Sequence, residues 1–564
     1  SDMSWLDPAT VPSDEIVYLD GEPGVLVQQG ARGSLSYSND NYDNNRRWRN
    51  WYVEASLSYA HKFDQKHDVN AVIVANQNVK YYPAGSYLGV TNCYQGIVGR
   101  GIYNYDSRYL ADVSLGYNGS ENFAQGLRFG LFPAGSIGWI ISEEDFFKAK
   151  NTIPFLKVRA SYGIVGNDRV SSSDRFLYLD STWERKSRSV NRGDLAGYDY
   201  NFGTDNTIFP GVSELLLANP IVTWEKAYKQ DYGVDFTLLE NKFSGTIDYY
   251  YENRENILWT SDNASALNGM SLPKLNLGKM RNSGVELDFK WNDKINKDWN
   301  YAVKFNAAYT KNVIVYQDEV LSEYPRANQT GHSRDQNFGY EVLGFYDERD
   351  GSVWWNGKKV DDGSSIVDQS GYALKSGDVV YKDLNHDGEI NYNDLTALGY
   401  PNYPLLNGGL TFELRWKGID LSILFTGATL TSRLLSSTYR RPTDETSNRA
   451  LMQFQYDNRW TSSESTTENT LPRASQTSAS NNYQASSLFI RDASYLRLKN
   501  FQIGYNFSGK WMKTLGLKQF RVYSTGYNIF TWDKIKVLDP EMYTRERSDY
   551  PVMRIINFGI NVTF

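Results

Sequence analysis

Cysteine and histidine are scarce in this chain of 564 residues. The lone cysteine, Cys93, permits no internal disulfide and no thiolate metal cluster. The four histidines, His61, His67, His332 and His386, show no metal-ligand spacing such as H-E-x-x-H. These absences exclude a disulfide-stapled scaffold and the common zinc sites.

Long apolar runs and an excess of positive charge are also missing. No stretch approaches the ~18 consecutive apolar residues that a spanning helix needs, which excludes helical membrane topologies. With 59 basic and 66 acidic residues, the net charge is -7 and the pI about 5.4, which argues against a nucleic-acid-binding surface. The chain does not open with a charged segment followed by an apolar one. We therefore expect either a removed signal peptide or a start within a longer protein.

Signatures of catalysis are absent as well. The sequence has no nucleophile elbow, Walker loop, dinucleotide glycine fingerprint or zinc signature. The neighbouring carboxylates Glu143 and Glu144 fall in an expected turn, a poor setting for glycosidase chemistry. We predict that the protein is not an enzyme.

What the chain does have is an abundance of aromatic residues in a hydrophilic background. Tyr, Phe and Trp make up 15% of the residues, yet hydrophobic residues total only 40% and mean hydropathy is -0.55. A membrane β-barrel has this composition, because its strands alternate lipid-facing apolar residues with lumen-facing polar ones.

Alternation with a period of two residues runs through the chain and predicts strands with two unlike faces. At the C-terminus, Ile556, Phe558, Ile560 and Val562 alternate with polar residues or glycine. Such apolar faces must be covered, either by lipid or by a second sheet. We expect about sixteen strands, near 24–38, 49–62, 68–79, 94–104, 108–118, 127–141, 155–166, 228–239, 242–254, 281–292, 299–312, 405–416, 419–430, 494–507, 518–530 and 553–564.

The connections between these strands alternate in length. Short ones include 240–241 and 417–418, whereas 167–227, 313–404 and 431–487 are long. A membrane barrel has short periplasmic turns and long outer loops, whereas a β-sandwich or propeller has no reason to gather its long loops at one end. The pattern predicts an all-β protein with an antiparallel transmembrane β-barrel. Residues 313–404 and 431–487 are then long extracellular loops.

Several sequence blocks stand out in a fixed order along the chain: FPAGSIGW at 132–139, LKVRASYG at 156–163, RNSGVE at 281–286, SYLRLKN at 494–500 and GYNIF at 526–530. Blocks of this kind in this order resemble those of the SusC/RagA-type TonB-dependent outer-membrane transporters of Bacteroidetes. The final Phe564 is similar to the C-terminal aromatic residue that barrel-assembly machinery reads.

The resemblance implies a 22-stranded barrel that is filled by an N-terminal plug and preceded by a TonB-interacting segment. Only about sixteen strands are readable, and neither a plug nor a TonB box is visible. We therefore interpret residues 1–564 as the C-terminal portion of one such barrel, about 16 of 22 strands, with the plug domain outside this chain. Pairing of strand 24–38 with strand 553–564 would contradict that interpretation.

The resemblance also implies a function and a location. The function is TonB-dependent import of oligosaccharides, or in a minority of cases peptides, together with a SusD-like surface lipoprotein and the TonB complex. The location is the outer membrane, among lipid and lipopolysaccharide, with the short turns and the C-terminus in the periplasm. Two alternatives stay open. One is a TonB-dependent receptor for a siderophore or corrinoid, and the other is a secreted all-β glycan-binding or adhesin module.

Residues 383–394 fit the pattern D-x-N-x-D-G-x-I-x-x-x-D of an EF-hand-like loop. Oxygens at positions 1, 3 and 5 of such a loop converge on a hard cation, and the glycine at position 6 allows the sharp turn. Position 12 is an aspartate, a shorter arm than the usual glutamate. We expect a structural calcium ion, with an Asn/Asp/Gly-rich turn without metal as the alternative. The candidate ligands are Asp383, Asn385, Asp387, Glu389 through its carbonyl, and Asp394.

Aromatic residues in the long loops are candidates for substrate binding. Trp354, Trp355, Tyr400 and Tyr403 suit stacking on sugar rings, and they would equally suit the docking of a partner lipoprotein. The sequence does not choose between these two roles.

Overall fold

The computed structural model describes most of the chain and divides it into two compact units. One unit comprises Ser1–Tyr52 and Asn78–Cys93, and the other comprises Val53–Gln77 and Tyr94–Phe564. The described residues are 49–81, 91–169, 176–179, 217–261, 272–361, 366–441, 451–474, 480–542 and 552–564, with strand backbones at 2–6, 17–19, 22–29, 183–184, 199–202, 207–210 and 213–214.

The smaller unit contains a three-stranded antiparallel sheet. Its strands are β1 (Asp2–Leu6), β2 (Val17–Leu19) and β3 (Glu22–Gln29), and β3 lies between the other two.

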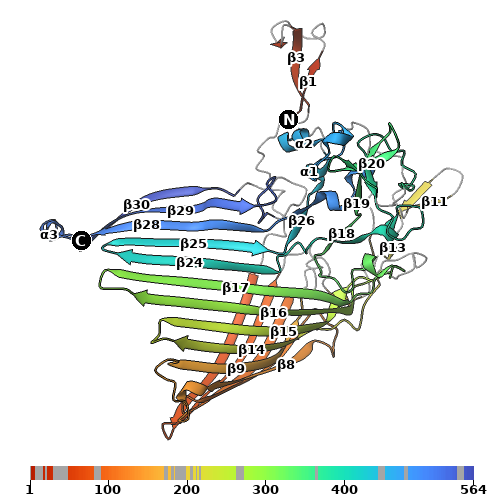
Figure 1. Ribbon diagram of the computed structural model, residues 1–564. Helices are drawn as coiled ribbons and strands as arrows, with labels where there is room; N and C mark the ends of the chain where they lie inside the picture. The colour runs from red at the N-terminus through yellow and green to blue at the C-terminus, as the bar shows by residue number, and fades with distance from the viewer. Residues whose placement is uncertain are drawn as a thin grey trace. The chain divides into compact units, whose positions relative to one another are not determined.

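The larger unit holds most of a fifteen-stranded antiparallel sheet in which each strand pairs with its neighbours in sequence order (Figure 1). This meander ends on β30 at one edge and β4 at the other. In order the strands are β4 (Arg49–Phe63), β5 (His67–Tyr81), β6 (Asn92–Tyr105), β7 (Tyr109–Ser120), β8 (Phe129–Ile140), β9 (Phe155–Asn167), β14 (Glu225–Leu238), β15 (Phe243–Trp259), β16 (Leu275–Lys294), β17 (Trp299–Tyr316), β24 (Leu406–Trp416), β25 (Ile419–Thr429), β28 (Tyr495–Phe507), β29 (Gln519–Asp533) and β30 (Ile555–Thr563).

Fifteen of the sixteen strands expected from the alternation are confirmed in this sheet. The barrel strand expected at 24–38 is wrong, because residues 24–29 belong to β3, which pairs with β1 and β2. Residues 30–38 lie outside the described part of the chain. Alternation identifies a strand, but it does not say which strand will be its partner. Strand β30 pairs with β29, not with residues 24–29.

The two faces of the sheet differ in chemistry, as the register of β16 and β17 shows. On β16, Leu287 and Phe289 lie opposite Ala307 and Phe305 of β17, and the intervening Asp288 lies opposite Asn306. Apolar side chains on the first face are open, as at Phe558 (84% exposed) and Ile137 (67% exposed). An uncovered apolar face beside a polar one is the arrangement of a barrel wall, with lipid on one side and the lumen on the other.

Short turns join the strands at one end of this sheet, where β30 also ends (Figure 1). Strands β24 and β25 are joined by Lys417 and Gly418 alone, with φ of 45° and 89°. Positive φ at both central residues is what a two-residue hairpin turn of type I′ requires, and glycine adopts it without strain. Asp64, Gln65, Asp106 and Ser107 adopt positive φ in two further short turns.

Two long connections at the opposite end fold together into what we call the loop module, residues 317–405 and 430–494 (Figure 1). Phe345, Tyr381 and Ile390 of the first connection share one buried core with Leu435 and Phe489 of the second. The module contains β18 (Asn337–Gly339) paired with β23 (Thr396–Leu398), a sheet of β19 (Val342–Asp347), β20 (Ser352–Trp355), β21 (Lys358–Lys359) and β22 (Val379–Tyr381), and β26 (Ser432–Leu434) paired with β27 (Ile490–Asp492).

Helices are few and short in the described residues. They are α1 (Ser437–Arg440), α2 (Gln453–Asn458) and α3 (Lys510–Thr514), with 3-10 turns η6 (Ile141–Glu143), η8 (Pro325–Ala327), η9 (Tyr392–Asp394), η10 (Ser463–Ser465), η11 (Ser480–Tyr483) and η12 (Ser487–Phe489). Among the residues that the structure describes, no helix is long and apolar enough to cross a membrane. Four short strands complete the inventory: β10 (Trp183–Glu184) paired with β13 (Ser213–Glu214), and β11 (Asp199–Phe202) paired with β12 (Thr207–Pro210).

The assignment of the two faces can be tested with one pair of substitutions. Leu287→Arg places a charge on the apolar face in the middle of β16 and should lower the free energy of unfolding by about 2–4 kcal/mol. Asn306→Arg places the same charge on the polar face of the adjacent strand and should change that free energy little. Denaturant unfolding in lipid vesicles measures both variants, and equal losses would contradict the assignment.

Candidate functional site

Ion pairs link neighbouring strands across the polar face of the sheet. The guanidinium of Arg159 on β9 lies 2.7 Å from Asp231 and 3.4 Å from Asp235, both on β14, and it also contacts Asp248 on β15. Further along the sheet, the ammonium of Lys304 on β17 lies 2.7 Å from Glu413 on β24. These pairs compensate charge between strands that lie one or two places apart in the sheet.

The EF-hand-like segment lies in the loop module and is closed by one buried carboxylate. Asp394 is fully buried, and its two oxygens accept the backbone N–H groups of Leu384 at 2.8 Å and Asn391 at 3.0 Å. The adjacent Ile390 is 4% exposed and belongs to the core of the module. Asp394 therefore ties the beginning of the segment to its end.

The other expected ligands also bond within the loop. Asp383 accepts the backbone N–H groups of His386 at 2.6 Å and Gly388 at 3.0 Å. Asp387 accepts the backbone N–H of Glu389 at 2.9 Å and the amide of Asn385 at 2.7 Å. These bonds, led by the one from Glu389, hold the pKa of Asp387 below its usual value, so the carboxylate is charged at neutral pH.

The donor set suits a hard cation, although the side chains do not converge on one point. All the candidate ligands offer oxygen, the atom that calcium prefers, and a carboxylate oxygen that accepts one N–H keeps a further lone pair. Within the described ranges, no group of three or more His, Cys, Asp or Glu side chains is placed to hold a metal. A cation would have to draw Asp383, Asn385 and Asp387 together on the exposed side of the turn.

The four candidate aromatic residues lie in two different settings. The ring of Trp355 stacks on Phe345 with centroids 6.0 Å apart, and the indole N–H of Trp354 donates to Ser352 at 2.8 Å. Tyr400 and Tyr403 are 47% and 58% exposed. The two tryptophans therefore contribute to the structure of the module, whereas the two tyrosines present open rings.

A buried polar junction that the sequence pattern did not reveal joins the two halves of the loop module. Asp378 has no exposed surface, and its carboxylate accepts the guanidinium of Arg473 at 2.6 Å and the amide of Asn482 at 2.7 Å. Asn482 in turn accepts the backbone N–H of Val379 at 2.9 Å. No periodicity connects residues about a hundred positions apart, so only the fold reveals this junction.

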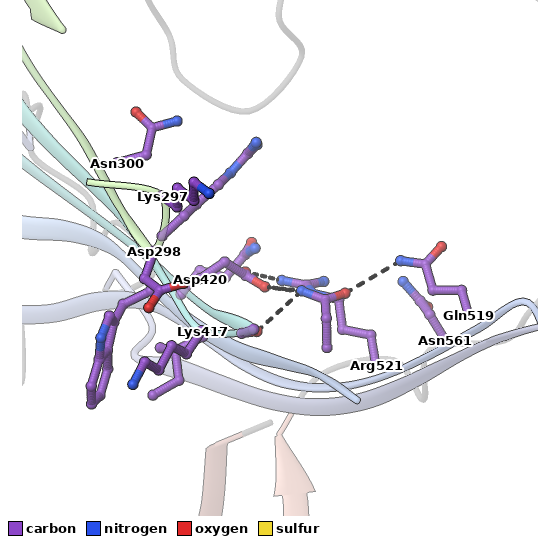
Figure 2. Close-up of a pocket in the computed structure, with 14 residues that line it drawn as sticks. Lys297, Asp298, Asn300, Lys417, Asp420, Gln519, Arg521 and Asn561 are labelled. Atoms are coloured by element: carbon purple, nitrogen blue, oxygen red, sulfur yellow. Dashed lines mark hydrogen bonds and ion pairs between the residues drawn. The ribbon is translucent and has the colours of Figure 1, made fainter. Parts of the chain in front are cut away.

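A polar recess lies at the short-turn end of the sheet, and sequence reasoning missed it too. It encloses about 750 Å³ on strands β17, β24, β25, β28, β29 and β30 (Figure 2). The guanidinium of Arg521 is fixed by the carboxylate of Asp420, which also accepts the amide of Asn506 at 2.8 Å. We call it the short-turn recess.

Comparison with known proteins shows which proteins share this architecture. No protein-family model matches the chain. It is 27% identical over 85% of its length to the TonB-dependent receptor P3 of Formosa agariphila, and 27% identical over 83% to the TonB-dependent receptor SusC of Bacteroides thetaiotaomicron. The solved RagAB peptide transporter superposes on 92% of the chain with a TM-score of 0.68 at 20% identity, which shows a shared fold.

The chain is similar to SusC/RagA-type TonB-dependent receptors over most of its length. It spans 46% of P3, 43% of SusC and 56% of the RagAB chain, about half the length of these relatives. SusC/RagA-type receptors are outer-membrane β-barrel proteins, and the apolar face of this sheet is the face that such a barrel turns to lipid. The relatives are receptors and transporters rather than enzymes. This similarity disfavours the secreted adhesin module.

The two hydrogen bonds by which Asp394 holds the ends of the 383–394 segment together, here called the Asp394 clamp, can be tested directly. Asp394→Ala leaves the N–H groups of Leu384 and Asn391 without an acceptor, at a cost of about 1–3 kcal/mol each. We expect hydrogen exchange of residues 383–394 to become faster by one to several orders of magnitude. Glu348→Ala, which removes an exposed carboxylate from the same module, is the control and should leave that exchange unchanged. Equal exchange in both variants would contradict the clamp.

Proposed function

We propose that the protein is part of a TonB-dependent importer that carries nutrient oligomers, either oligosaccharides or peptides, across the outer membrane. The observation that carries this proposal is the fifteen-stranded wall with a charged polar face and a folded loop module at one end. In a closed barrel such a wall lines an aqueous path, and the module stands where a ligand arrives.

The similarity to named relatives supports import but not one ligand class. The relatives P3 and SusC are described only as TonB-dependent receptors, and RagAB is described as a peptide transporter. At 20% identity, the likeness to RagAB concerns the fold. The loops set the ligand, and the exposed rings of Tyr400 and Tyr403 suit sugar stacking and peptide contact alike.

A SusD-like lipoprotein is the proposed partner at the outer face. A rigid docking surface is a prerequisite for a stable complex, and the loop module has the buried core that gives one. The exposed rings of Tyr400 and Tyr403 could contact such a partner as well as a ligand. Their exposure therefore fits either role.

One double variant separates these two roles. Tyr400→Ala with Tyr403→Ala should weaken binding of the cognate oligosaccharide or peptide about tenfold if the rings contact ligand, since buried aromatic anchors contribute strongly to binding. If they contact the lipoprotein, the yield of co-purified lipoprotein should fall instead while ligand affinity is kept. Calorimetry of the purified receptor against glycan and peptide pools gives the first readout, and affinity purification from the outer membrane gives the second.

The control for that pair is Tyr392→Ala, which removes another exposed tyrosine, 68% exposed, from the same module.

Import itself is tested by uptake of labelled oligomers in cells with and without the gene. If the gene supports uptake of a siderophore or corrinoid but not of labelled oligomers, the nutrient-oligomer proposal is wrong. That result would favour a siderophore or corrinoid receptor.

We also propose that residues 383–394 bind a structural calcium ion through Asp383, Asn385 and Asp387, with Glu389 offering its carbonyl and Asp394 holding the loop ends. The all-oxygen donor set and the ionised state of Asp387 support this.

Calcium binding has its own test. Calorimetric titration of calcium into EDTA-treated receptor should show one site, and Asp387→Ala should weaken it at least tenfold because a charged ligand is lost. Asp361→Ala, an exposed acid outside the loop, is the matched control. Absence of heat at millimolar calcium would leave the segment as a metal-free Asn/Asp/Gly turn.

A further inference from the structure

The connection between β28 and β29, which we call the basic turn (residues 508–518), differs from the other connections at its end of the sheet in its charge. It carries Lys510, Lys513 and Lys518, and no Asp or Glu occurs anywhere from residue 493 to residue 532. The net charge of the whole chain is -7. The basic turn is therefore a local concentration of positive charge on an otherwise anionic protein.

The three lysines of the basic turn are exposed, and no carboxylate pairs with them within the ranges that the structure describes. Lysines in other connections at the same end of the sheet are paired. The ammonium of Lys242 lies 3.1 Å from Asp293, and that of Lys150 lies 3.5 Å from Glu143. The basic turn thus presents cations that neighbouring side chains do not neutralise.

Helix α3, which forms half of the basic turn, folds against the apolar face of the wall (Figure 1). The ring of Trp511 lies 6.2 Å from that of Phe507 and 6.0 Å from that of Phe520, centroid to centroid. These two phenylalanines face each other across β28 and β29. The next pair on the same face, Tyr505 and Val522, is 42% and 40% exposed. The helix therefore lies on the side of the wall that a barrel turns to lipid, at the level where the strands end.

The basic turn also keeps apolar side chains open beside its lysines. Met512 is buried, whereas Trp511 and Leu515 are 43% and 62% exposed. Tryptophan and leucine next to lysine are typical of chain that lies in a membrane interface, with rings at the acyl boundary and ammonium groups among the headgroups. Helix α3 is too short to bind a membrane by itself, but its contact with Phe507 and Phe520 holds it at that level.

We propose that the basic turn binds anionic phospholipid in the leaflet at the short-turn end of the barrel. Lys510, Lys513 and Lys518 attract the phosphate of the headgroup, and Trp511 and Leu515 contact the upper part of the acyl chains. Lysines near an anionic membrane surface add to its attraction one by one, whereas a zwitterionic headgroup attracts them less. The proposal rests on the position of the sheet in a membrane, and it does not depend on the imported nutrient or on the lipoprotein.

Native mass spectrometry of the purified full-length receptor, titrated with phosphatidylglycerol or phosphatidylcholine, tests the proposal. Exchanging all three lysines, Lys510→Gln, Lys513→Gln and Lys518→Gln, should weaken binding of the tightest phosphatidylglycerol at least about tenfold. Binding of phosphatidylcholine should not change. Affinity of the wild type for phosphatidylglycerol should fall as ionic strength rises, because salt screens exposed charges.

The control removes the same number of positive charges from other connections at the same end of the sheet. It combines Lys66→Gln, Lys150→Gln and Lys242→Gln, and it should change the affinity for phosphatidylglycerol less than about twofold. Resistance to heat in detergent, checked for both triple variants, separates a lost contact from a misassembled barrel.

Two further measurements identify the occupant. Soluble glycerol phosphate should not displace phosphatidylglycerol at equal concentration, because it lacks the acyl chains that Trp511 and Leu515 contact. Leu515→p-benzoylphenylalanine places a photocrosslinker on the open side of the turn, and irradiation in the native outer membrane should give a receptor with the added mass of a phospholipid.

Four results would overturn the proposal. These are equal losses of phosphatidylglycerol binding in the two triple variants, phosphatidylcholine bound as tightly as phosphatidylglycerol, displacement by glycerol phosphate, and crosslinks from residue 515 to protein alone. The third would indicate a site for free anions, and the fourth would indicate a surface for a protein partner.

Discussion

The constraint on which the rest of this structure depends is that a backbone in lipid must find all its hydrogen-bond partners within the protein. The chain meets it with a hydrogen-bond ladder that joins fifteen strands, each to the next one in the sheet. Because a strand shows its two faces alternately, the same ladder separates Leu287 and Phe289, which meet lipid, from Asp288, which meets the lumen. The ladder also brings distant parts of the sequence into register, and the ion pairs of Arg159 and Lys304 depend on that register.

The loop module, which lies in water, also has buried polar groups that need hydrogen-bond partners, and it supplies many of them from side chains. Its strands are only two to six residues long, so side chains take over where the ladder stops. Asp378 accepts from Arg473 and Asn482, and Asp394 accepts from two backbone N–H groups. A buried carboxylate without these partners would be costly, so the two halves of the module are held in one arrangement. That rigidity is what a surface for ligand or partner requires.

The sequence predicts the sheet well and the sites poorly, for a physical reason. Lipid on one side and water on the other impose the alternation that can be read at residues 285–291 or 556–564, and turn chemistry such as Lys417-Gly418 marks the hairpins. The strand expected at 24–38 fails because a local pattern does not encode a partner. The junction at Asp378 and the short-turn recess could not be predicted, since each joins side chains from segments far apart in the sequence.

Charge compensation is distributed unevenly over the polar face. Around Arg159 three carboxylates surround one guanidinium, an arrangement that fixes three strands to one another. At Arg415 the neighbouring carboxylate is engaged by Arg521 instead, and the guanidinium is left over. In an aqueous lumen an unpaired charge costs little stability, so folding does not demand a partner there. The recess therefore combines a fixed pair, Arg521 with Asp420, and an exposed guanidinium whose pairing the wall does not need for its stability.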